Sequence, residues 1–262
     1  MAQSGDPRDS EIEVRHLYRV ARIPFRLTGR RAAIVLSALI LTDVLFVTAY
    51  LFSTLADVRA FTVGQRLASF DLDLVANLPW GYSVLKLYAA SGIAALVVLG
   101  AEPGQRAPPF WYVAAATMTV IAVLGTTRLD ELWAAGLAVA LFGDETSTDT
   151  YRLLLEGSVL GVLYIAALIQ LPARSRLALT LFALSLAAFL LARAPAEWGL
   201  GPSGVFQPTV SGLIEKFGAA ATDVAWHQGF RMLGISFVIG ALAFATRDLQ
   251  RDAVRYIYHG ND

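Results

Sequence analysis

The chain alternates between long apolar runs and shorter polar connections. A bilayer core of about 30 Å needs roughly 20 apolar residues per helix, and six runs reach or approach that length. They are Ala32–Leu55, Pro79–Gly100, Pro109–Thr127, Leu153–Leu171, Arg176–Leu191 and Val224–Thr246, of which the fifth is the shortest. The pattern predicts an all-α, polytopic membrane protein with about six transmembrane helices. Its parts are an arm over residues 1–31, a six-helix membrane domain over 32–246 and a tail over 247–262.

Both ends of the chain carry regularly spaced arginines. The segment Glu11–Arg31 interleaves them with apolar positions, which suits a helix on an anionic cytoplasmic leaflet, at about 1 kcal/mol per arginine. A solvated arm that only sets the topology is the alternative. The candidate lipid-surface residues are Arg15, Arg19, Arg22 and Arg26. In the tail, Arg247, Arg251 and Arg255 alternate with Asp248 and Asp252, which predicts a solvated helix with internal ion pairs.

The connections expected on the outer side are the longer ones, and two of them contain apolar stretches. Leu132–Phe142 is too short to span a membrane, and runs of that length are more often interfacial, re-entrant or buried. Thr209–Ala220 is predicted to be a helix with four apolar side chains on one side, namely Val210, Leu213, Ile214 and Phe217. We therefore expect a partly ordered outer cap that includes interfacial helices.

The composition agrees with a membrane protein and excludes several classes of function. The chain of 262 residues is 56% hydrophobic and 16% charged, whereas soluble domains carry about 25% charged residues. Its 21 basic and 21 acidic side chains cancel, so no charge excess favours a nucleic-acid partner. Cysteine is absent, which excludes disulfides, Cys-ligated zinc, iron–sulfur clusters and thiol nucleophiles.

The distribution of basic residues predicts the orientation of the spans, because cytoplasmic flanks carry an excess of Lys and Arg. With the N-terminus inside, the inner side collects Arg8, Arg15, Arg19, Arg22, Arg26, Arg30, Arg31, Arg106, Arg174, Arg176, Arg247, Arg251 and Arg255. The outer side collects only Arg59, Arg66, Arg128, Arg152, Arg193 and Lys216. No cleavage pattern follows the first run, which therefore reads as an uncleaved anchor. We expect both termini in the cytoplasm.

Seven ionisable residues lie within the predicted spans or at their boundaries, where charge is costly and marks a candidate site. They are Asp43, Lys86, Asp130, Glu131, Glu156, His227 and Arg231. Two interpretations remain open. In the first, Lys86 and Arg231 pair with the acidic residues of the outer third and lock the helices together. In the second, the cluster lines a hydrated vestibule with Asp43 below it as an ion or proton site.

Asp43 fits the first interpretation least well. It lies twelve residues into its run, near the expected midplane, and the other six residues are expected in the outer third. A lone carboxyl there can be protonated and donate to a neighbouring helix. A proton relay would need a chain of titratable groups, and no further acidic residue lies in the inner halves of the spans.

Motifs for several enzyme classes are missing. The chain has no GxxxxGK[ST], HExxH or GxSxG, so nucleotide, zinc-protease and serine-hydrolase chemistry has no support. We predict no cofactor, no metal site and no catalytic residues. His227 is interpreted as an ordinary hydrogen-bonded histidine, and a single pigment or metal contact is the alternative.

Two segments resemble a group of uncharacterised bacterial polytopic membrane proteins. One is Phe70-Asp71-Leu72-Asp73 with Ala76-Asn77-Leu78-Pro79-Trp80, and the other is Leu129-Asp130-Glu131. The His-Glu pair that usually follows the second segment in that group is missing here. The resemblance implies a shared fold and a polar feature on the outer face, in a bacterial inner membrane, and it implies no known activity.

Three functions are compatible with these patterns. The first is a non-enzymatic structural or assembly subunit of a larger inner-membrane complex, with the lipid bilayer and other membrane-protein subunits as partners. The second is a small transporter or channel with an outer polar vestibule. The third is a membrane enzyme that uses Asp130, Glu131, Glu156 and His227. The absence of chemical motifs favours the first.

Overall fold

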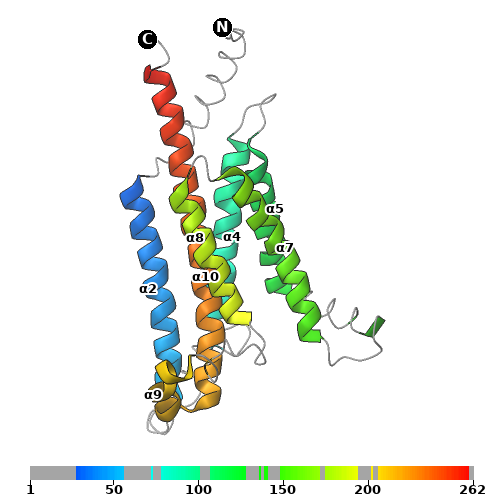
Figure 1. Ribbon diagram of the computed structural model, residues 1–262, viewed down its shortest axis with the longest axis vertical. Coiled ribbons are helices and arrows are strands. Elements are labelled where there is room, and N and C mark those ends of the chain that lie inside the picture. Colours follow the sequence, from blue (N-terminus) through cyan, green and yellow to red (C-terminus); the bar gives the residue numbers. More distant parts are fainter. Residues whose placement is uncertain are drawn as a thin grey trace. The chain divides into compact units, whose positions relative to one another are not determined.

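The structure, a computed structural model, describes residues 28–55, 72, 78–100, 107–127, 136, 139–140, 148–171, 175–193, 202 and 206–259. In these ranges it has seven helices and no strand: α2 (Gly29–Ser53), α4 (Leu78–Leu99), α5 (Pro109–Thr127), α7 (Thr148–Gln170), α8 (Arg176–Arg193), α9 (Gln207–Phe217) and α10 (Ala219–His259) (Figure 1). The all-helical fold class is confirmed for this part of the chain.

Each of the six apolar runs lies in a helix of its own. Four of these helices contain stretches long and apolar enough to cross a membrane: Gly29–Ser53, Leu78–Leu99, Pro109–Thr127 and Ala219–Arg251. Two shorter apolar helices, Glu156–Gln170 and Arg176–Ala192, correspond to the fourth and fifth runs. Length and composition therefore support at least four spans.

A sharp break separates α9 from α10. Helix α9 was expected to continue to Ala220, but it ends at Phe217 because Gly218 adopts a left-handed φ of 88°. Glycine takes this conformation without the steric cost that a Cβ would bring, and the Gly218 N–H bonds to the Ile214 carbonyl. Helix α10 then begins at Ala219, five residues before the predicted sixth span, and runs without interruption into the tail.

The chain divides into two compact units that are discontinuous in sequence. Unit 1 contains residues up to Ala33, Tyr88–Thr180 and Gly240 onwards, and unit 2 contains Ile34–Leu87 and Leu181–Ile239. The boundaries fall inside α2, α4, α8 and α10, so no linker marks them in the sequence.

Polar side chains tie the ends of helices together in unit 1. The backbone N–H of Phe110, in the first turn of α5, donates to Gln170 Oε1 of α7 at 3.0 Å. Ser175 precedes α8 and donates to Asp248 Oδ2 at 2.5 Å, and Asp248 also accepts from its neighbour Arg247. Asp248 is only 9% exposed, so the prediction of a solvated helix was wrong at this residue, while its pair with Arg247 is one of the internal ion pairs that were predicted.

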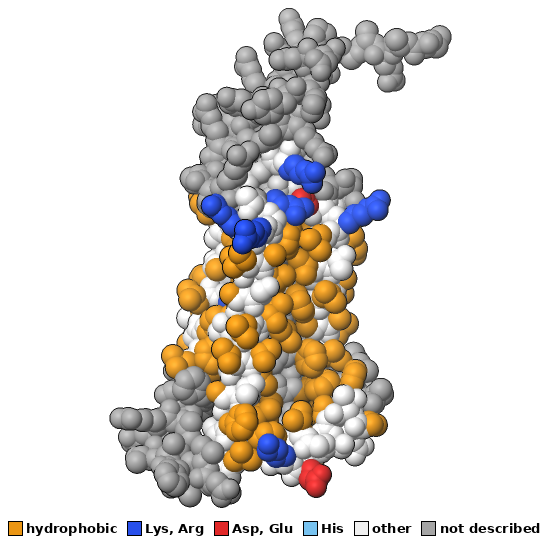
Figure 2. Space-filling view, turned by 90° about the vertical axis from the view of Figure 1, so that its left-hand side faces the viewer, with side chains coloured by type: hydrophobic (Ala, Val, Ile, Leu, Met, Phe, Trp, Pro, Cys, Tyr) orange, Lys and Arg blue, Asp and Glu red, His pale blue; other side chains and the backbone are white. Residues whose placement is uncertain are grey.

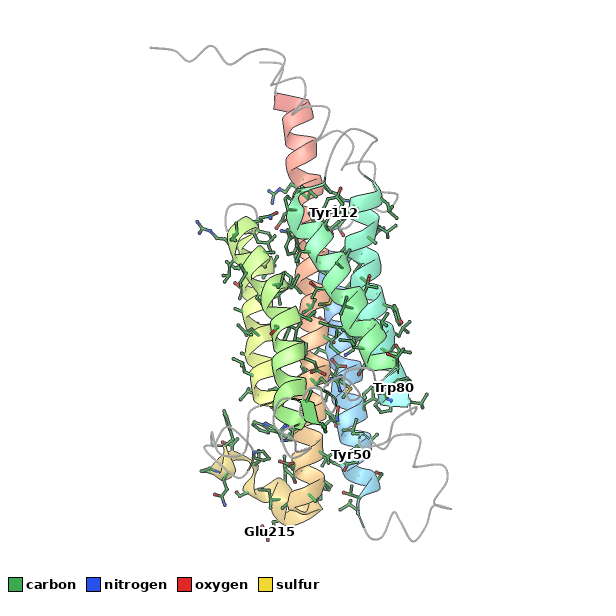
Figure 3. All side chains as sticks on the ribbon, turned by 90° about the vertical axis from the view of Figure 1, so that its right-hand side faces the viewer. Tyr50, Trp80, Tyr112 and Glu215 are labelled. Carbon is green, nitrogen blue, oxygen red and sulfur yellow. The ribbon has the colours of Figure 1, made fainter. Side chains whose placement is uncertain are left out.

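Unit 2 is held by apolar packing with close helix approaches. Tyr50, labelled in Figure 3, is buried with Leu72, Ala225 and Met232 in one cluster. Helices α8 and α10 approach closely at Gly234, where an added Cβ would lie 3.1 Å from the ring of Phe189. Such close approach through small residues is typical of helix packing in membranes.

The outward side of α2 remains apolar. Large hydrophobic side chains gather on the face of the molecule shown in Figure 2. On α2, the side chains that are about half exposed or more are Ile34, Val35, Leu41, Val44, Leu45 and Phe52. A helix that presents this surface suits an apolar surrounding, such as lipid or a partner helix.

Candidate functional site

An ion pair lies buried inside unit 2, between two of the helices that could span a membrane. Lys86 Nζ of α4 lies 2.6 Å from Asp43 Oδ1 of α2, and the two side chains are 2% and 1% exposed. Both residues sit in otherwise apolar stretches of their helices. Buried charges are costly unless they are paired and hydrogen-bonded, so the remaining partners decide what this pair can do.

The ammonium group of Lys86 uses its full donor capacity. Besides Asp43, Nζ donates to the Met232 carbonyl at 2.9 Å and to Ser236 Oγ at 3.2 Å, both on α10. Met232 and Ser236 are four residues apart and therefore lie on the same face of that helix. A lysine ammonium has three N–H donors, and each has an acceptor here.

Both carboxylate oxygens of Asp43 are also engaged. Oδ1 accepts from Lys86, and Oδ2 accepts from Ser236 Oγ at 2.6 Å. Because the serine hydroxyl donates to Asp43, its lone pairs are available to Lys86, so the two bonds of Ser236 are mutually compatible. The cluster of Asp43, Lys86 and Ser236 thus joins α2, α4 and α10 in one hydrogen-bonded network.

Tyr82 covers the ammonium group from one side. Its ring centroid lies 4.6 Å from Lys86 Nζ, within the range of a cation–π contact, and 5.3 Å from the ring of Phe46. The Tyr82 hydroxyl donates to the Leu39 carbonyl of α2 at 3.3 Å. The aromatic face adds to the attraction that holds the lysine in place.

An apolar cavity of about 260 Å³ adjoins the cluster within unit 2. Asp43 lies in its wall, and the other lining residues are Val44, Val47, Thr48, Leu51, Val210, Leu213, Thr222, Ala225, Trp226, Gly229, Phe230 and Leu233. Almost all of the lining surface is carbon. The cavity can hold an apolar group, and it offers no series of polar atoms that would hydrate an ion.

The structure corrects the expected partner of Lys86. Asp43 was interpreted as an unpaired carboxyl near the midplane, with Lys86 paired to outer acidic residues; instead the two pair with each other. Counting residues from the end of α2 and from the start of α4 shows that the two residues lie at comparable distances along their helices. Asp43 precedes the end of α2 by ten residues and Lys86 follows the start of α4 by eight, or about 15 and 12 Å at 1.5 Å per residue.

Sequence reasoning missed Ser236, Tyr82 and the carbonyl of Met232. A single serine in an apolar helix is ordinary, and its hydroxyl commonly bonds to its own helix, so no signal in the sequence marked it. The spacing of Tyr82 and Lys86 places both on one face of α4, which was the only hint available for the tyrosine.

His227, Arg231 and Glu156 are the remaining predicted residues that the structure describes. His227 Nδ1 lies 2.8 Å from the Ala192 carbonyl, so this nitrogen carries the proton, and Nε2 faces Asp223 at 3.4 Å. Arg231 is half-buried on α10 of unit 2, and Glu156 is half-buried on α7 of unit 1. The predicted pairing of Arg231 with an outer acidic residue stays a prediction.

Several predicted residues lie outside the described part of the chain. They are Asp130 and Glu131, the arginines of the arm (Arg15, Arg19, Arg22 and Arg26) and most of the Leu132–Phe142 segment. Across the residues that the structure does describe, no group of three or more His, Asp or Glu side chains could hold a metal ion. A pigment or metal contact at His227 stays a hypothesis.

Comparisons with protein-family models, with curated proteins and with solved structures find no match to this chain. The site therefore has to be interpreted from its own geometry. That geometry is a saturated, buried ion pair that joins three helices, beside a cavity lined by carbon.

Proposed function

We propose that the chain is an integral membrane protein with six spans and a non-enzymatic role, as a structural or assembly subunit of a larger bacterial inner-membrane complex. One observation carries this proposal. All three donors of Lys86 and both oxygens of Asp43 are bound by the protein itself, so the charges at depth hold helices together. Neither group is left free to take up a substrate, ion or proton without breaking the network.

The membrane placement has independent support. Four helices are long and apolar enough to cross a bilayer, two shorter apolar helices accompany them, and α2 presents an apolar outward side. In water, burying a leucine side chain lowers the free energy, so exposed leucines are unfavourable there. In lipid the surroundings are as apolar as leucine itself, so exposing it costs nothing. The arginine distribution supports cytoplasmic termini.

The assembly role is tested by the mass of the protein as extracted from the membrane. The native chain, released in mild detergent, should elute and weigh as a stoichiometric complex with other membrane proteins. The matched sample is the variant Lys86→Met/Asp43→Leu, which replaces the ion pair with apolar side chains and should keep both fold and complex. Recovery of the native chain as an isolated monomer or homodimer would contradict a subunit role.

The orientation is tested with single cysteines, which is simple because the chain contains none. Cysteines placed at Ser4, Asp144 and Ser203 should differ in their reaction with an impermeant thiol reagent on intact cells. We expect labelling at Asp144 and Ser203 and protection at Ser4. Labelling of the Ser4→Cys variant from outside would overturn the orientation.

The basic arm is tested separately. Changing Arg15, Arg19, Arg22 and Arg26 to glutamine should weaken the binding of the Glu11–Arg31 peptide to anionic vesicles at low salt. If the unchanged peptide shows no affinity for such vesicles, a solvated arm replaces the lipid-surface helix.

A transporter is favoured over an assembly subunit by one observation only, the contact between the cavity and Asp43. Transport through this site would need the ion pair to open during the cycle. In that case Asp43→Asn would abolish flux in reconstituted vesicles, and a double apolar replacement would not restore it. Unchanged growth and assembly with the double replacement supports the structural role.

A further inference from the structure

The cavity beside Asp43 is an elongated groove between α2 and α10. It extends along α2 from Asp43 to Leu51, about 12 Å at 1.5 Å per residue, and along α10 from Thr222 to Leu233, about 16 Å. Val210 and Leu213 of α9 line it as well. Helix α2 therefore borders the space over about two turns and α10 over about three.

The groove is open on the outward side of α2. Val44, in its wall, is 50% exposed, and Thr48, one turn further, is also exposed. Leu213 of α9 is 41% exposed. A ligand can therefore enter sideways from the surroundings of α2, which are apolar along that helix.

Two polar side chains that line the groove, those of Asp43 and Thr222, already have hydrogen-bond partners within the protein, so a ligand does not have to supply one to them. Both oxygens of Asp43 are bonded to Lys86 and Ser236. The hydroxyl of Thr222 donates to the Gly218 carbonyl of its own chain segment. The chemistry of the walls thus matches a hydrocarbon.

A positive charge stands near the other end of the groove. Lys216 follows the lining residue Leu213 by three positions on α9, so the two lie on neighbouring positions of the helix surface. Its Nζ lies 5.7 Å from the ring centroid of Phe52 and 5.3 Å from that of Phe217. Phe52 is the direct neighbour of Leu51, the last residue of α2 in the groove. The ammonium is thereby held where the apolar groove ends.

We propose that this groove binds one acyl chain of a phospholipid whose phosphate lies at Lys216. The inference rests on the membrane placement proposed above and adds a specific ligand to it. The acyl chain occupies the space from Leu51 towards Asp43, and the anionic phosphodiester meets the ammonium of Lys216, which lies over the ring of Phe52, the neighbour of the lining residue Leu51.

The size of the cavity selects a single chain. Pockets that enclose whole drug-sized ligands have about 300–1,000 Å³, and this one has about 260 Å³. A whole lipid therefore does not fit, but one of its chains does. An empty groove would leave the lining atoms without contacts on one side, and a flexible chain restores these dispersion contacts.

Trp226 provides a built-in reporter of occupancy. It lines the groove, and its ring is fixed by a hydrogen bond from Nε1 to the Leu191 carbonyl and by contact with Phe230. Bromine atoms on an acyl chain quench tryptophan fluorescence on contact. The probe is a phosphatidylglycerol brominated near the middle of its acyl chains, titrated into the full chain in detergent with Trp80, Trp111, Trp133 and Trp198 changed to Phe.

Two pairs of variants separate the groove from the general lipid surroundings. Thr48→Phe fills the groove from an exposed position, and Ser37→Phe adds the same ring three turns earlier on the same side of α2, outside the groove. Lys216→Gln removes the rim cation, and Glu215→Gln neutralises its exposed neighbour, labelled in Figure 3. If the multiple tryptophan replacement does not fold, the native chain and its Trp226→Phe variant are compared instead.

We expect quenching of Trp226 that saturates near one lipid per protein. Thr48→Phe should raise the half-saturating lipid concentration by about tenfold or more, because the chain loses its space. Lys216→Gln should raise it by about fivefold, because one lysine near an anionic headgroup is lost. Ser37→Phe and Glu215→Gln should leave it unchanged or, for Glu215→Gln, slightly lower.

Two results would overturn the proposal. Quenching that grows without saturation and ignores Thr48→Phe would mean contact with bulk lipid only. Equal quenching by a brominated diacylglycerol, with no effect of Lys216→Gln, would mean that a hydrocarbon binds without any role for phosphate.

Alkaline carbonate extraction of the same variants distinguishes the two levels of the argument. If the chain stays in the membrane but shows no saturable quenching, only the proposed lipid site is wrong. If carbonate releases the chain from the membrane, the proposed membrane placement and the lipid site are both wrong.

Discussion

The Nζ atom of Lys86 lies 2.6 Å from Oδ1 of Asp43, and a third side chain, Ser236, bonds to both of them. Removing one member of such a buried pair leaves the other charge without compensation, whereas replacing both with apolar side chains of similar size is often neutral or stabilising. We therefore expect that the loss of either charge alone destabilises the fold much more than the loss of both.

Lys86→Met should lower the free energy of unfolding in detergent by about 3–5 kcal/mol, because Asp43 stays buried without its cation. The double variant Lys86→Met/Asp43→Leu should recover most of this loss. Thermal unfolding followed by circular dichroism measures both. Arg176→Met is the matched control, since it removes a cation from an exposed position, and it should change stability little.

A melting temperature of Lys86→Met equal to that of the native chain would show that the ion pair does not hold the helices together. A double variant as unstable as the single one would show that the pair itself, and not the stranded carboxylate, is what the fold requires.

Ser236→Ala should cost about 1–3 kcal/mol, because a donor to Asp43 and an acceptor for Lys86 disappear in a place that water does not reach. Ser83→Ala on α4 is the control, since the Ser83 hydroxyl only bonds back to the Pro79 carbonyl of its own helix. Equal effects of the two changes on chemical denaturation would contradict a role of Ser236 in the network.

Gly234→Ala should destabilise unit 2 by about 1–3 kcal/mol, because the new methyl group would meet three ring carbons of Phe189 at 3.1 Å. A second change, Phe189→Leu, should recover part of the loss. Gly92→Ala on α4 has no atom within 4 Å of the added Cβ and should be neutral or stabilising by up to about 1 kcal/mol. Differential scanning calorimetry of the three variants checks the order.

Ser175→Ala should cost more than Thr28→Ala, although both remove a side-chain cap at the start of a helix. Thr28 Oγ1 accepts only from the Arg31 N–H, whereas Ser175 Oγ accepts from the Ala178 N–H and also donates to the buried Asp248. Loss of a cap costs about 0.5–2 kcal/mol, and the loss of the hydrogen bond to the buried Asp248 Oδ2 adds to it, although Oδ1 keeps its bonds from Arg247. Identical unfolding midpoints of the two variants would show that the hydrogen bond between Ser175 and Asp248 does not stabilise unit 1.

The helices themselves could be predicted from the sequence because hydropathy is a local property. Each apolar run became a helix, and the boundaries of α5 match the expected run at both ends. The short helix α9 was also expected, and only its end was misplaced, because the φ angle of Gly218 is not encoded by hydropathy. Of the six predicted spans, four lie in helices that are long and apolar enough to cross a membrane, and two lie in shorter apolar helices.

The candidate site was predicted only in its components. Asp43 and Lys86 stood out because charge is rare in apolar helices, but the assumed depths placed them apart and assigned them different partners. A difference of about 3 Å in depth is easily bridged by a lysine side chain, so the depth argument alone could not choose the pairing. The roles of Asp130, Glu131 and the arginine arm lie outside the described residues and stay predictions.

The sequence by itself determined the helical class, the apolar spans and the charges that need an explanation. Only the tertiary structure decided that Asp43, Lys86 and Ser236 meet, that Gly234 lies against Phe189, and that a groove ends near Lys216. The physical reason is that helix formation depends on neighbours within a few residues. Contacts between helices depend on the rotation and depth of each one, and residues 43, 86 and 236 share no local pattern that encodes these.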